Sequence, residues 1–501
     1  MEGTFIRTTN TDFKRILSWL IVHSFGMPES HIGDGLNSFI ANLKEDLMTF
    51  VEPIYVDKVY RDSYYTYYAS KSSNVPKNCI RISFFEDDGH HINEGRLDFA
   101  QYEYLKEHYR GFLVIRPTLS SIIGRNVISP AIVKNNNFII CKTSITSNVG
   151  GFKVITEAFP AASQDAETMT CAETTVWAMM EYFGNRYPEY TPLLPSTIVS
   201  ILKQTTIERQ LPSHGLTEDN LSYIAKSCGF GSQLYHRNFF PDFNNILSCY
   251  IESGIPIMVA LSNKQYLSEN ETEENFLGHA VLCIGHESIT ERHIDNAVAT
   301  DLGSGIRLVD FDNIEKKFVF IDDNFPPYQM DDLEEPTKRY SDFFGNGQGW
   351  EHCQIDHFVA PLYHKVYLDP TVAKEYLKSL IISPLIEQIH NTEITLRVFL
   401  CSTRSYLDYV IKSSMSDDMK REMLHLTLPR FVWVAELSDR NNMKMGNATG
   451  AILLDATECR TEHHNALLVS FCGGEVLYKE NQILSKGTIN MNPFKMYQNL
   501  K

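Results

Sequence analysis

The stretch that most constrains the fold is SQDAETMTCAETTVWAMMEYFG, which runs from Ser163 to Gly184. After Cys171, its apolar residues recur at the spacing of one helix face, and Thr168 or Thr170 is placed to cap the helix start. We therefore expect Cys171 at a helix N-terminus. The positive end of a helix dipole favours the thiolate, which is the attacking form of a cysteine.

A series of further elements follows this helix. GLTEDNLSYIAKSCGF, from Gly215, predicts a helix capped by Thr217 and ended by Gly229. FNNILSCYIESGIPIMVAL predicts a second helix and then a buried strand at 255–261. In FLGHAVLCIGHE, His279 begins another strand, and FVFIDDNFPPY predicts a strand with an acidic end.

This order of elements resembles the papain-like cysteine peptidases, and most closely the bacteriocin-processing branch that cuts after double-glycine leaders. Its motif is a glutamine, a short spacer, and a cysteine that opens an apolar helix ending in an aromatic pair and glycine. The matching residues are Gln164, Cys171, Tyr182, Phe183 and Gly184. Ala172 stands where the family usually has glycine, and the glutamine lies one residue farther from the cysteine. The resemblance covers the region 158–328.

The resemblance implies a papain-like fold in which Cys171 is the nucleophile and His279 is the base. The base is expected on a strand that faces the helix of the cysteine. Gln164 and the backbone N–H of Cys171 are expected to stabilise the tetrahedral oxyanion. The expected activity is hydrolysis of a peptide or protein amide bond through an acyl-enzyme.

The strand FVFIDDNFPPY offers Asp322, Asp323 or Asn324 to orient the imidazole of His279. By analogy with the family's hydrophobic run that ends in Asp-Pro, Asp323 is favoured and Asp322 comes next. Neighbouring residues of a strand point to opposite faces, so only one of the two aspartates is expected to face the site.

The length of 501 residues exceeds that of one typical domain, about 100 to 200 residues, so we expect three domains. The expected fold class is α+β, with a papain-like cysteine peptidase domain at 151–365. It is flanked by α+β domains of unknown role at 1–150 and 366–501. No internal repeat or low-complexity tract changes this division.

The flanking domains show both helical and strand patterns. Helical periodicity occurs near 12–25 and 32–50. The expected strands of the first domain are IYVDKVY from Ile54, CIRISFF from Cys79, GFLVIRP from Gly111 and NFIICKT from Asn137. The last domain opens with the helical stretch TVAKEYLKSLIISPLIEQI and continues with the strands TLRVFLC, RFVWVAEL and NALLVSFC.

The composition favours an ordinary globular protein, with 43% hydrophobic and 21% charged residues. A net charge of -17 disfavours a broad nucleic-acid surface, which needs a basic patch. Asp12, Lys14 and Arg15 interrupt any signal-peptide pattern, and no stretch reaches the length of a membrane span. We therefore expect a cytoplasmic protein that associates with neither nucleic acid nor membrane.

Ten cysteines are too dilute for a disulfide scaffold, and none forms a CxxC pair. His463 and His464 precede the strand of Cys472 but lack a nucleophile on a helix, so neither a metal site nor a second thiol site is expected there. His90 and His91 follow an acidic turn with Asp87 and Asp88, but neighbouring strand residues diverge. No metal or cofactor is expected.

Two further features have alternative interpretations. Arg116 and Arg125 lie beside turn residues and could bind a carboxylate or other anion, although structural salt bridges are the favoured interpretation. The segment 263–276 carries four glutamates just before His279. It could gate the site or select basic substrates, but a solvated loop is favoured.

Three functions fit the sequence. A cysteine peptidase would use water as the acyl acceptor, whereas an acyltransferase or transglutaminase-like enzyme would use an amine, and a deamidase would act on a side-chain amide. A third reading is a catalytically inactive module that binds a peptide. Expected partners are a peptide or protein substrate and, through the flanking domains, another protein.

Overall fold

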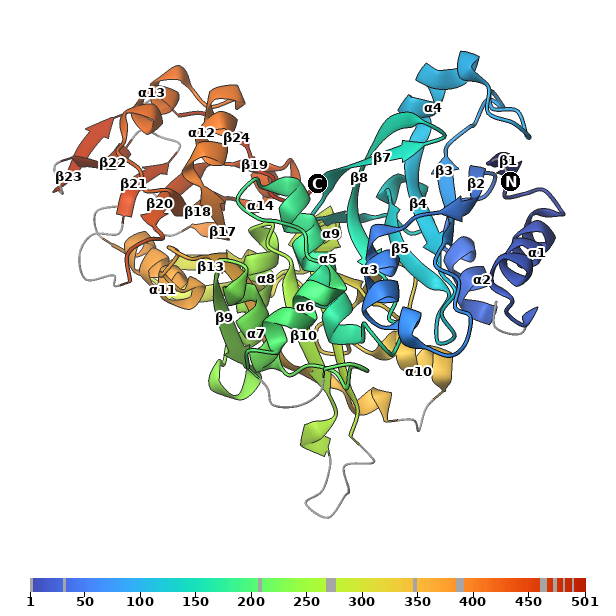
Figure 1. Cartoon of the computed structure of the whole chain (residues 1–501). Coiled ribbons are helices and arrows are strands. Elements are labelled where there is room, and N and C mark those ends of the chain that lie inside the picture. The colour runs from blue at the N-terminus through green and yellow to red at the C-terminus, as the bar shows by residue number, and fades with distance from the viewer. Residues whose placement is uncertain are drawn as a thin grey trace. The chain divides into compact units, whose positions relative to one another are not determined.

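The computed structural model describes residues 3–29, 33–205, 210–266, 276–345, 349–383, 392–459, 466–471, 475–480, 483–488 and 491–501 (Figure 1). The chain forms two compact units, each assembled from separate segments. Unit 1 comprises Met1–Gly229, Met258–Ile284 and Val319–Val359, and unit 2 comprises Phe230–Ile257, Gly285–Phe318 and Ala360–Lys501. Both units mix helices and strands, so the expected α+β class is confirmed. The three consecutive domains expected from the sequence stay a prediction.

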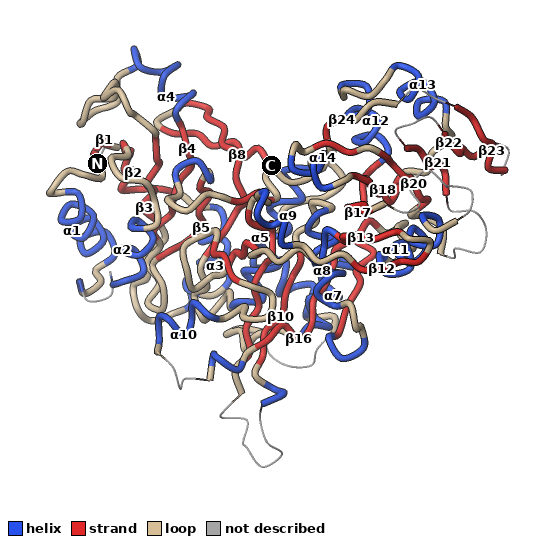
Figure 2. Tube along the Cα trace, turned by 180° about the vertical axis from the view of Figure 1, so that it is seen from behind, coloured by secondary structure: helices blue, strands red, loops and turns tan. Residues whose placement is uncertain are grey.

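Unit 1 contains a seven-stranded antiparallel sheet of order β1-β2-β3-β4-β5-β8-β7. Figure 2 shows β2, β3, β4, β5 and β8 next to one another. The strands are β1 (Thr4–Arg7), β2 (Met48–Tyr55), β3 (Cys79–Phe85), β4 (Tyr109–Ile115), β5 (Ile123–Ile128), β7 (Thr143–Val149) and β8 (Phe152–Ala162). Every residue of β3 is buried, because protein covers both faces at the middle of the sheet.

The helices of unit 1 include the one that begins at Cys171. They are α1 (Phe13–Phe25), α2 (Gly33–Ala41), α3 (Lys58–Thr66), α4 (Tyr102–His108), α5 (Cys171–Arg186), α6 (Pro195–Leu202), α7 (Glu218–Ser227) and α10 (Lys338–Phe344). Helix α5 packs against β7 and β8 and contacts α6 and α7. Its residues from Ala172 to Phe183 are all buried, so it is a core helix whose first residue reaches the surface.

A second sheet contains the strand on which His279 lies. Within unit 1 its order is β15-β14-β11-β10-β16, and the short strand β6 pairs with β11. These strands, which have most of their residues in unit 1, are β6 (Phe138–Ile140), β10 (Ile257–Ser262), β11 (Gly278–Glu287), β14 (Phe318–Ile321), β15 (Gln329–Asp331) and β16 (Gln354–Tyr363).

Unit 2 is built on an eight-stranded sheet of order β12-β13-β17-β18-β20-β21-β22-β23. The strands of unit 2, of which β9, β19 and β24 lie outside this sheet, are β9 (Phe230–His236), β12 (Thr300–Gly303), β13 (Ile306–Asp310), β17 (Glu393–Ser402), β18 (Phe431–Ser438), β19 (Asn447–Ala448), β20 (Gly450–Asp455), β21 (Ala466–Phe471), β22 (Glu475–Glu480), β23 (Ile483–Thr488) and β24 (Phe494–Lys495). Its helices are α8 (Phe243–Glu252), α9 (Glu291–Asn296), α11 (Pro370–Ile381), α12 (Thr403–Lys412), α13 (Asp417–His425) and α14 (Arg440–Lys444). Apolar residues of α12 and α13 pack on β17, β18 and β20 to form a core.

Most expected elements are present, but two near the N-terminus are wrong. The helix expected at 32–50 ends at Ala41, because Met48–Phe50 belong to β2. Of the strand expected at 54–60, only Ile54 and Tyr55 are in a strand, at the end of β2, since Lys58 begins α3. Asp57 accepts hydrogen bonds from the backbone N–H groups of Val59 and Tyr60, and this cap fixes the start of the helix.

No helix in the described part of the chain is long and apolar enough to cross a membrane.

Candidate active site

Cys171 is the first residue of α5, as the sequence predicts. Thr170, not Thr168, is the N-cap residue, and its backbone N–H donates to the carboxylate of Glu173 at 3.1 Å. The N–H of Cys171 has no carbonyl partner within the helix, because helical hydrogen bonds begin one turn later. The thiol is partly exposed, so an electrophile can reach it. Both properties suit a nucleophile at a helix N-terminus.

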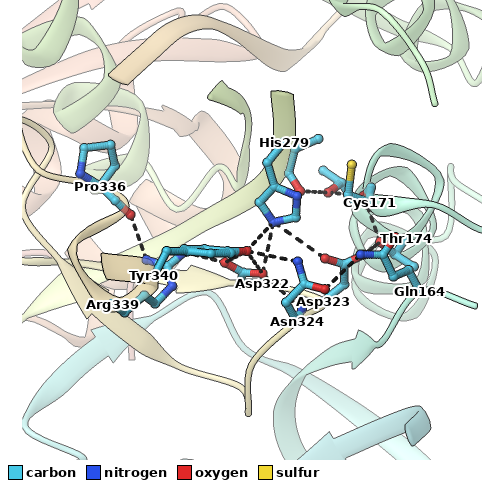
Figure 3. A network of polar contacts seen from close by, with 12 residues as sticks. Gln164, Cys171, Thr174, His279, Asp322, Asp323, Asn324, Pro336, Arg339 and Tyr340 are labelled. Carbon is cyan, nitrogen blue, oxygen red and sulfur yellow. Dashed lines mark hydrogen bonds and ion pairs between the residues drawn. The ribbon is translucent and has the colours of Figure 1, made fainter. Parts of the chain in front are cut away.

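His279 is the second residue of β11, and its ring lies between Cys171 and a group of acidic side chains (Figure 3). Its Nε2 atom is 3.1 Å from Oδ1 of Asp322. Burial opposes a charge on His279, but the Asp322 carboxylate and its hydrogen bond outweigh burial and raise the pKa of His279 well above its ordinary value. A hydrogen bond with Cys171 acts in the same direction. The geometry therefore favours an imidazolium beside the cysteine.

Asp322 and Asp323 both lie near His279, which contradicts the expectation that only one of them faces it. The distances from Nε2 are 3.1 Å to Asp322 and 3.6 Å to Asp323. Strand β14 ends at Ile321, so both aspartates lie in the following turn, where the alternation of a strand does not apply. The structure also makes Asp322 the nearer partner, in place of the favoured Asp323.

The two carboxyls have opposite ionisation tendencies. Burial favours the neutral form of Asp322, but His279 and Arg339 lower its pKa well below the ordinary range. Burial, together with the Asp322 charge, raises the pKa of Asp323 to about 7 even though His279 opposes this shift. The site therefore pairs an ionised Asp322 with an Asp323 that takes up a proton much more readily than an ordinary aspartate.

The surroundings of Asp323 offer few hydrogen bonds to an ionised carboxylate. Its Oδ2 is 3.1 Å from the hydroxyl of Thr174, which also lies 2.8 Å from the carbonyl oxygen of Cys171. The Thr174 hydroxyl is the donor to Asp323, and this bond opposes the increase in the pKa of Asp323 that burial causes. The other oxygen of Asp323 is buried and has no hydrogen-bond partner within the described residues. An ionised carboxylate would be poorly solvated there.

Helix α10 provides two residues that contact Asp322. Arg339 forms an ion pair with Oδ2 of Asp322 and a second ion pair with Asp331. The hydroxyl of Tyr340 lies 3.0 Å from both oxygens of Asp322 and 2.8 Å from Nε2 of His279. Asp322 is thus held from several directions, which fixes its orientation toward His279.

Gln164 lies in the loop after β8, on the same side of the site as Cys171 in Figure 3. Its amide nitrogen donates to the side-chain oxygen of Asn324 at 2.8 Å. This bond uses one of the two amide protons and leaves the other available for an oxyanion.

The loop of Gln164 is held in place by buried Arg116. One guanidinium nitrogen donates to the carbonyl oxygens of Ser163 and Gln164, at 2.7 Å each. Asp165 lies 4.0 Å from the same guanidinium and accepts backbone N–H bonds within the loop. Arg116 therefore has the structural contacts that the sequence favoured over anion binding.

The other candidates from the sequence lie apart from this site or outside the described residues. Arg125 pairs with Asp57 at 2.9 Å and lies 3.7 Å from Glu181 of α5, so it is a buried structural cation. Asp87 accepts from Arg7 and from backbone N–H groups, which commits this carboxylate to the fold. Residues outside the description are His463, His464, Cys472 and the glutamates of 267–275.

Among the described residues, one group combines three metal-ligating side chains with ligand atoms within 4.8 Å of one another. It consists of His279, Asp322 and Asp323. The guanidinium of Arg339 occupies one oxygen of Asp322 and opposes a second cation there. The two aspartates also contact the imidazole of His279, so a cation between the three residues would compete with those contacts.

Sequence reasoning missed Thr174, Arg339 and Tyr340. Thr174 follows Cys171 by one helical turn, so helical spacing could have placed it at the site. Arg339 and Tyr340 follow Asp322 by 17 and 18 residues, and no spacing rule connects a strand end to a helix at that separation.

The arrangement brings together the parts of a thiol acylation site. Cys171 can attack a carbonyl, His279 can protonate a leaving group, and Gln164 can donate to an oxyanion. No protein-family model matches the chain, and no curated protein sequence is significantly similar to it.

Proposed function

We propose that the chain is a papain-like cysteine peptidase that hydrolyses an amide bond of a peptide or protein. The observation that carries this proposal is the placement of His279 between Cys171 and Asp322, with its Nε2 bonded to the carboxylate. An ionised carboxylate only accepts, so Nε2 must carry a proton and Nδ1 is left for the thiol. This is the proton arrangement that thiol catalysis requires.

In the proposed reaction, the thiolate of Cys171 attacks the amide carbon and the carbonyl electrons move to oxygen. The backbone N–H of Cys171 and the amide of Gln164 stabilise this oxyanion, with about 3 to 4 kcal/mol from each well-placed donor. The C–N bond then breaks as the imidazolium of His279 protonates the leaving amine. Water, deprotonated by the neutral imidazole, releases the acyl group and restores the thiolate.

The identity of the acyl acceptor and the cellular compartment are part of the same proposal. Water makes the chain a peptidase, whereas an amine would make it a transferase, and attack on a side-chain amide would make it a deamidase. We place the activity in the cytoplasm, because every cysteine in the described segments is a free thiol. The flanking regions 1–150 and 366–501 would present the substrate or recruit a protein partner.

The test is digestion of a mixed peptide pool by the full chain and by its Cys171→Ala variant, with products identified by mass spectrometry. The proposal predicts new peptide termini with the wild type alone. With a transglutaminase-like enzyme, a side-chain amide would lose ammonia to form the acyl-enzyme, and added hydroxylamine would convert this to a side-chain hydroxamate without new peptide termini. Identical peptide pools after both incubations, together with an unlabelled Cys171, would point to a peptide-binding module.

A further inference from the structure

One chain of polar contacts connects Gln164 with His279 across the candidate site (Figure 3). Gln164 donates to the side-chain oxygen of Asn324 at 2.8 Å. The side-chain nitrogen of Asn324 donates to the hydroxyl of Tyr340 at 3.0 Å, and this hydroxyl lies 2.8 Å from Nε2 of His279. The candidate oxyanion donor and the candidate base thus have Tyr340 as a shared neighbour.

The donor and acceptor roles along this chain follow from the charge on Asp322. An ionised carboxylate only accepts, so the single proton of the Tyr340 hydroxyl is donated to Asp322 at 3.0 Å. The hydroxyl oxygen then accepts from Asn324, and it shares the single proton of Nε2 of His279 with Asp322. The hydroxyl oxygen of Tyr340 therefore contacts the candidate base directly and the candidate oxyanion donor through Asn324.

Packing fixes the position of this hydroxyl independently of its hydrogen bonds. Tyr340 is 1% exposed. Its ring stacks on Trp350 with centroids 4.3 Å apart and meets the edge of Phe325 at 4.8 Å. A phenylalanine would keep these ring contacts, so the hydroxyl can be removed without emptying the space.

We propose that Tyr340 is a positioning residue that ties the base to the oxyanion donor. It orients His279 directly through Nε2 and orients Gln164 through Asn324. This inference rests on the proposed thiol chemistry and adds a specific claim to it. Loss of the Tyr340 hydroxyl should affect both the base and the oxyanion arm, whereas loss of Asn324 should affect only the oxyanion arm.

Two reagents test the base and the oxyanion donor separately, and neither requires a known substrate. Iodoacetamide alkylates the thiolate by displacing iodide, so no oxyanion forms. With p-nitrophenyl acetate, the thiolate attacks the carbonyl carbon, an oxyanion forms, and p-nitrophenolate leaves with the bonding electrons. Gln164 should influence the second reaction alone. The second-order rates of both reactions are measured from pH 5 to 9 on the full chain, with Cys171→Ala subtracted.

For Tyr340→Phe, we expect alkylation at pH 7 to fall about tenfold, the effect of losing one hydrogen bond to a charged group. The pH profile of alkylation should also shift, because Asp322 and His279 both lose a partner. The rate of acylation should fall about fiftyfold, since Gln164 also loses the support that Tyr340 gives it through Asn324.

For Asn324→Ala, whose side chain lies at the surface, acylation should fall about fivefold while alkylation stays within about twofold. The variant with both substitutions should be acylated no more slowly than Tyr340→Phe. Loss of the Tyr340 hydroxyl already breaks its contact with Asn324, so removing Asn324 as well should have no further effect. Independent, multiplying losses in the double variant would overturn the proposed link. So would an unchanged pH profile in a folded Tyr340→Phe protein.

The matched control is Tyr235→Phe in unit 2, which also removes a buried hydroxyl that donates to an aspartate, here Asp369 at 2.6 Å. Both rates should stay at the wild-type value in this variant. If wild-type Cys171 reacts no faster than an ordinary thiol, the proposed function fails. If it reacts fast and Tyr340→Phe matches it, only the role of Tyr340 fails.

Discussion

Asp322 lies in the turn after β14 and accepts a hydrogen bond from Nε2 of His279 at 3.1 Å. The pairing raises the pKa of the histidine and lowers the pKa of the aspartate, so each favours the charged form of the other. Arg339 adds a second cation to Asp322, whereas burial and the Asp322 charge outweigh the effect of His279 on Asp323 and raise the pKa of that carboxyl.

Asp322→Asn should slow alkylation of Cys171 by iodoacetamide at pH 6 about 100-fold, because the imidazolium loses its counter-charge. Asp323→Asn should slow it by less than about tenfold, since asparagine resembles the protonated carboxyl. Rates measured by intact mass on both folded variants decide between them. A larger loss of rate in Asp323→Asn than in Asp322→Asn would favour Asp323 as the residue that orients His279, as predicted from the sequence.

Asp323 should also make stability depend on pH. The unfolded chain releases this proton near about pH 4, whereas the folded site holds it until about pH 7. The folded state therefore binds more protons between these values. The stabilisation is present below about pH 4 and is lost as pH rises through 7.

Asp323→Asn should remove this loss of stability with rising pH. The free energy of unfolding of the variant, relative to wild type, should rise by about 2 to 4 kcal/mol between pH 5 and 8. Asp165→Asn is the control, because Arg116 and local hydrogen bonds overcome burial and lower the pKa of Asp165, so its stabilisation is lost only as the pH falls below about 4 and its curve should run parallel to that of wild type between pH 5 and 8. Denaturant titrations at several pH values give both slopes. Parallel curves for Asp323→Asn and wild type would contradict a proton on Asp323.

Gln164→Ala should separate carbonyl chemistry from simple thiol reactivity. Acylation of Cys171 by p-nitrophenyl acetate should fall about 100-fold, the usual effect of removing one oxyanion donor. Alkylation by iodoacetamide should stay within about twofold. Equal effects on the two reactions would mean that Gln164 supports the loop and not the oxyanion.

A separate prediction concerns stability in unit 2, where Arg397 is buried between two carboxylates. Its guanidinium forms ion pairs with Glu252 and with Glu436. Arg397→Met should lower the free energy of unfolding by about 3 to 5 kcal/mol, because two buried carboxylates lose their shared cation. Arg421→Met, which removes an exposed partner of Asp418, should cost less than about 1 kcal/mol. Similar urea midpoints for the two variants would contradict this account.

The sequence predicted the elements of the site better than their local geometry. The helix at Cys171, the cap at Thr217 and the strand at His279 follow from periodicity and capping, which act over a few residues. The choice between Asp322 and Asp323 depended on where β14 ends, and helical or strand periodicity does not define that point. The contacts of Tyr340 come from tertiary packing, which no local pattern encodes.

The same limit explains the errors near the N-terminus. Residues 42–50 carry apolar spacing that suits a helix, but sheet pairing with β1 and β3 places Met48–Phe50 in β2. At Ile54, apolar and aromatic residues suggested a strand, whereas the side chain of Asp57 caps a helix. Tertiary pairing and one capping residue outweighed local propensity in these two places.

The most direct test of the central claim is intact-mass analysis of the native chain after brief treatment with iodoacetamide or E-64. The wild type should gain a single fast adduct, and Cys171→Ala should gain none on the same time scale. Cys228, a partly exposed thiol whose pKa burial raises to about 11, should stay unlabelled in both. Equal, slow labelling of wild type and variant would contradict an activated Cys171 and favour a peptide-binding module.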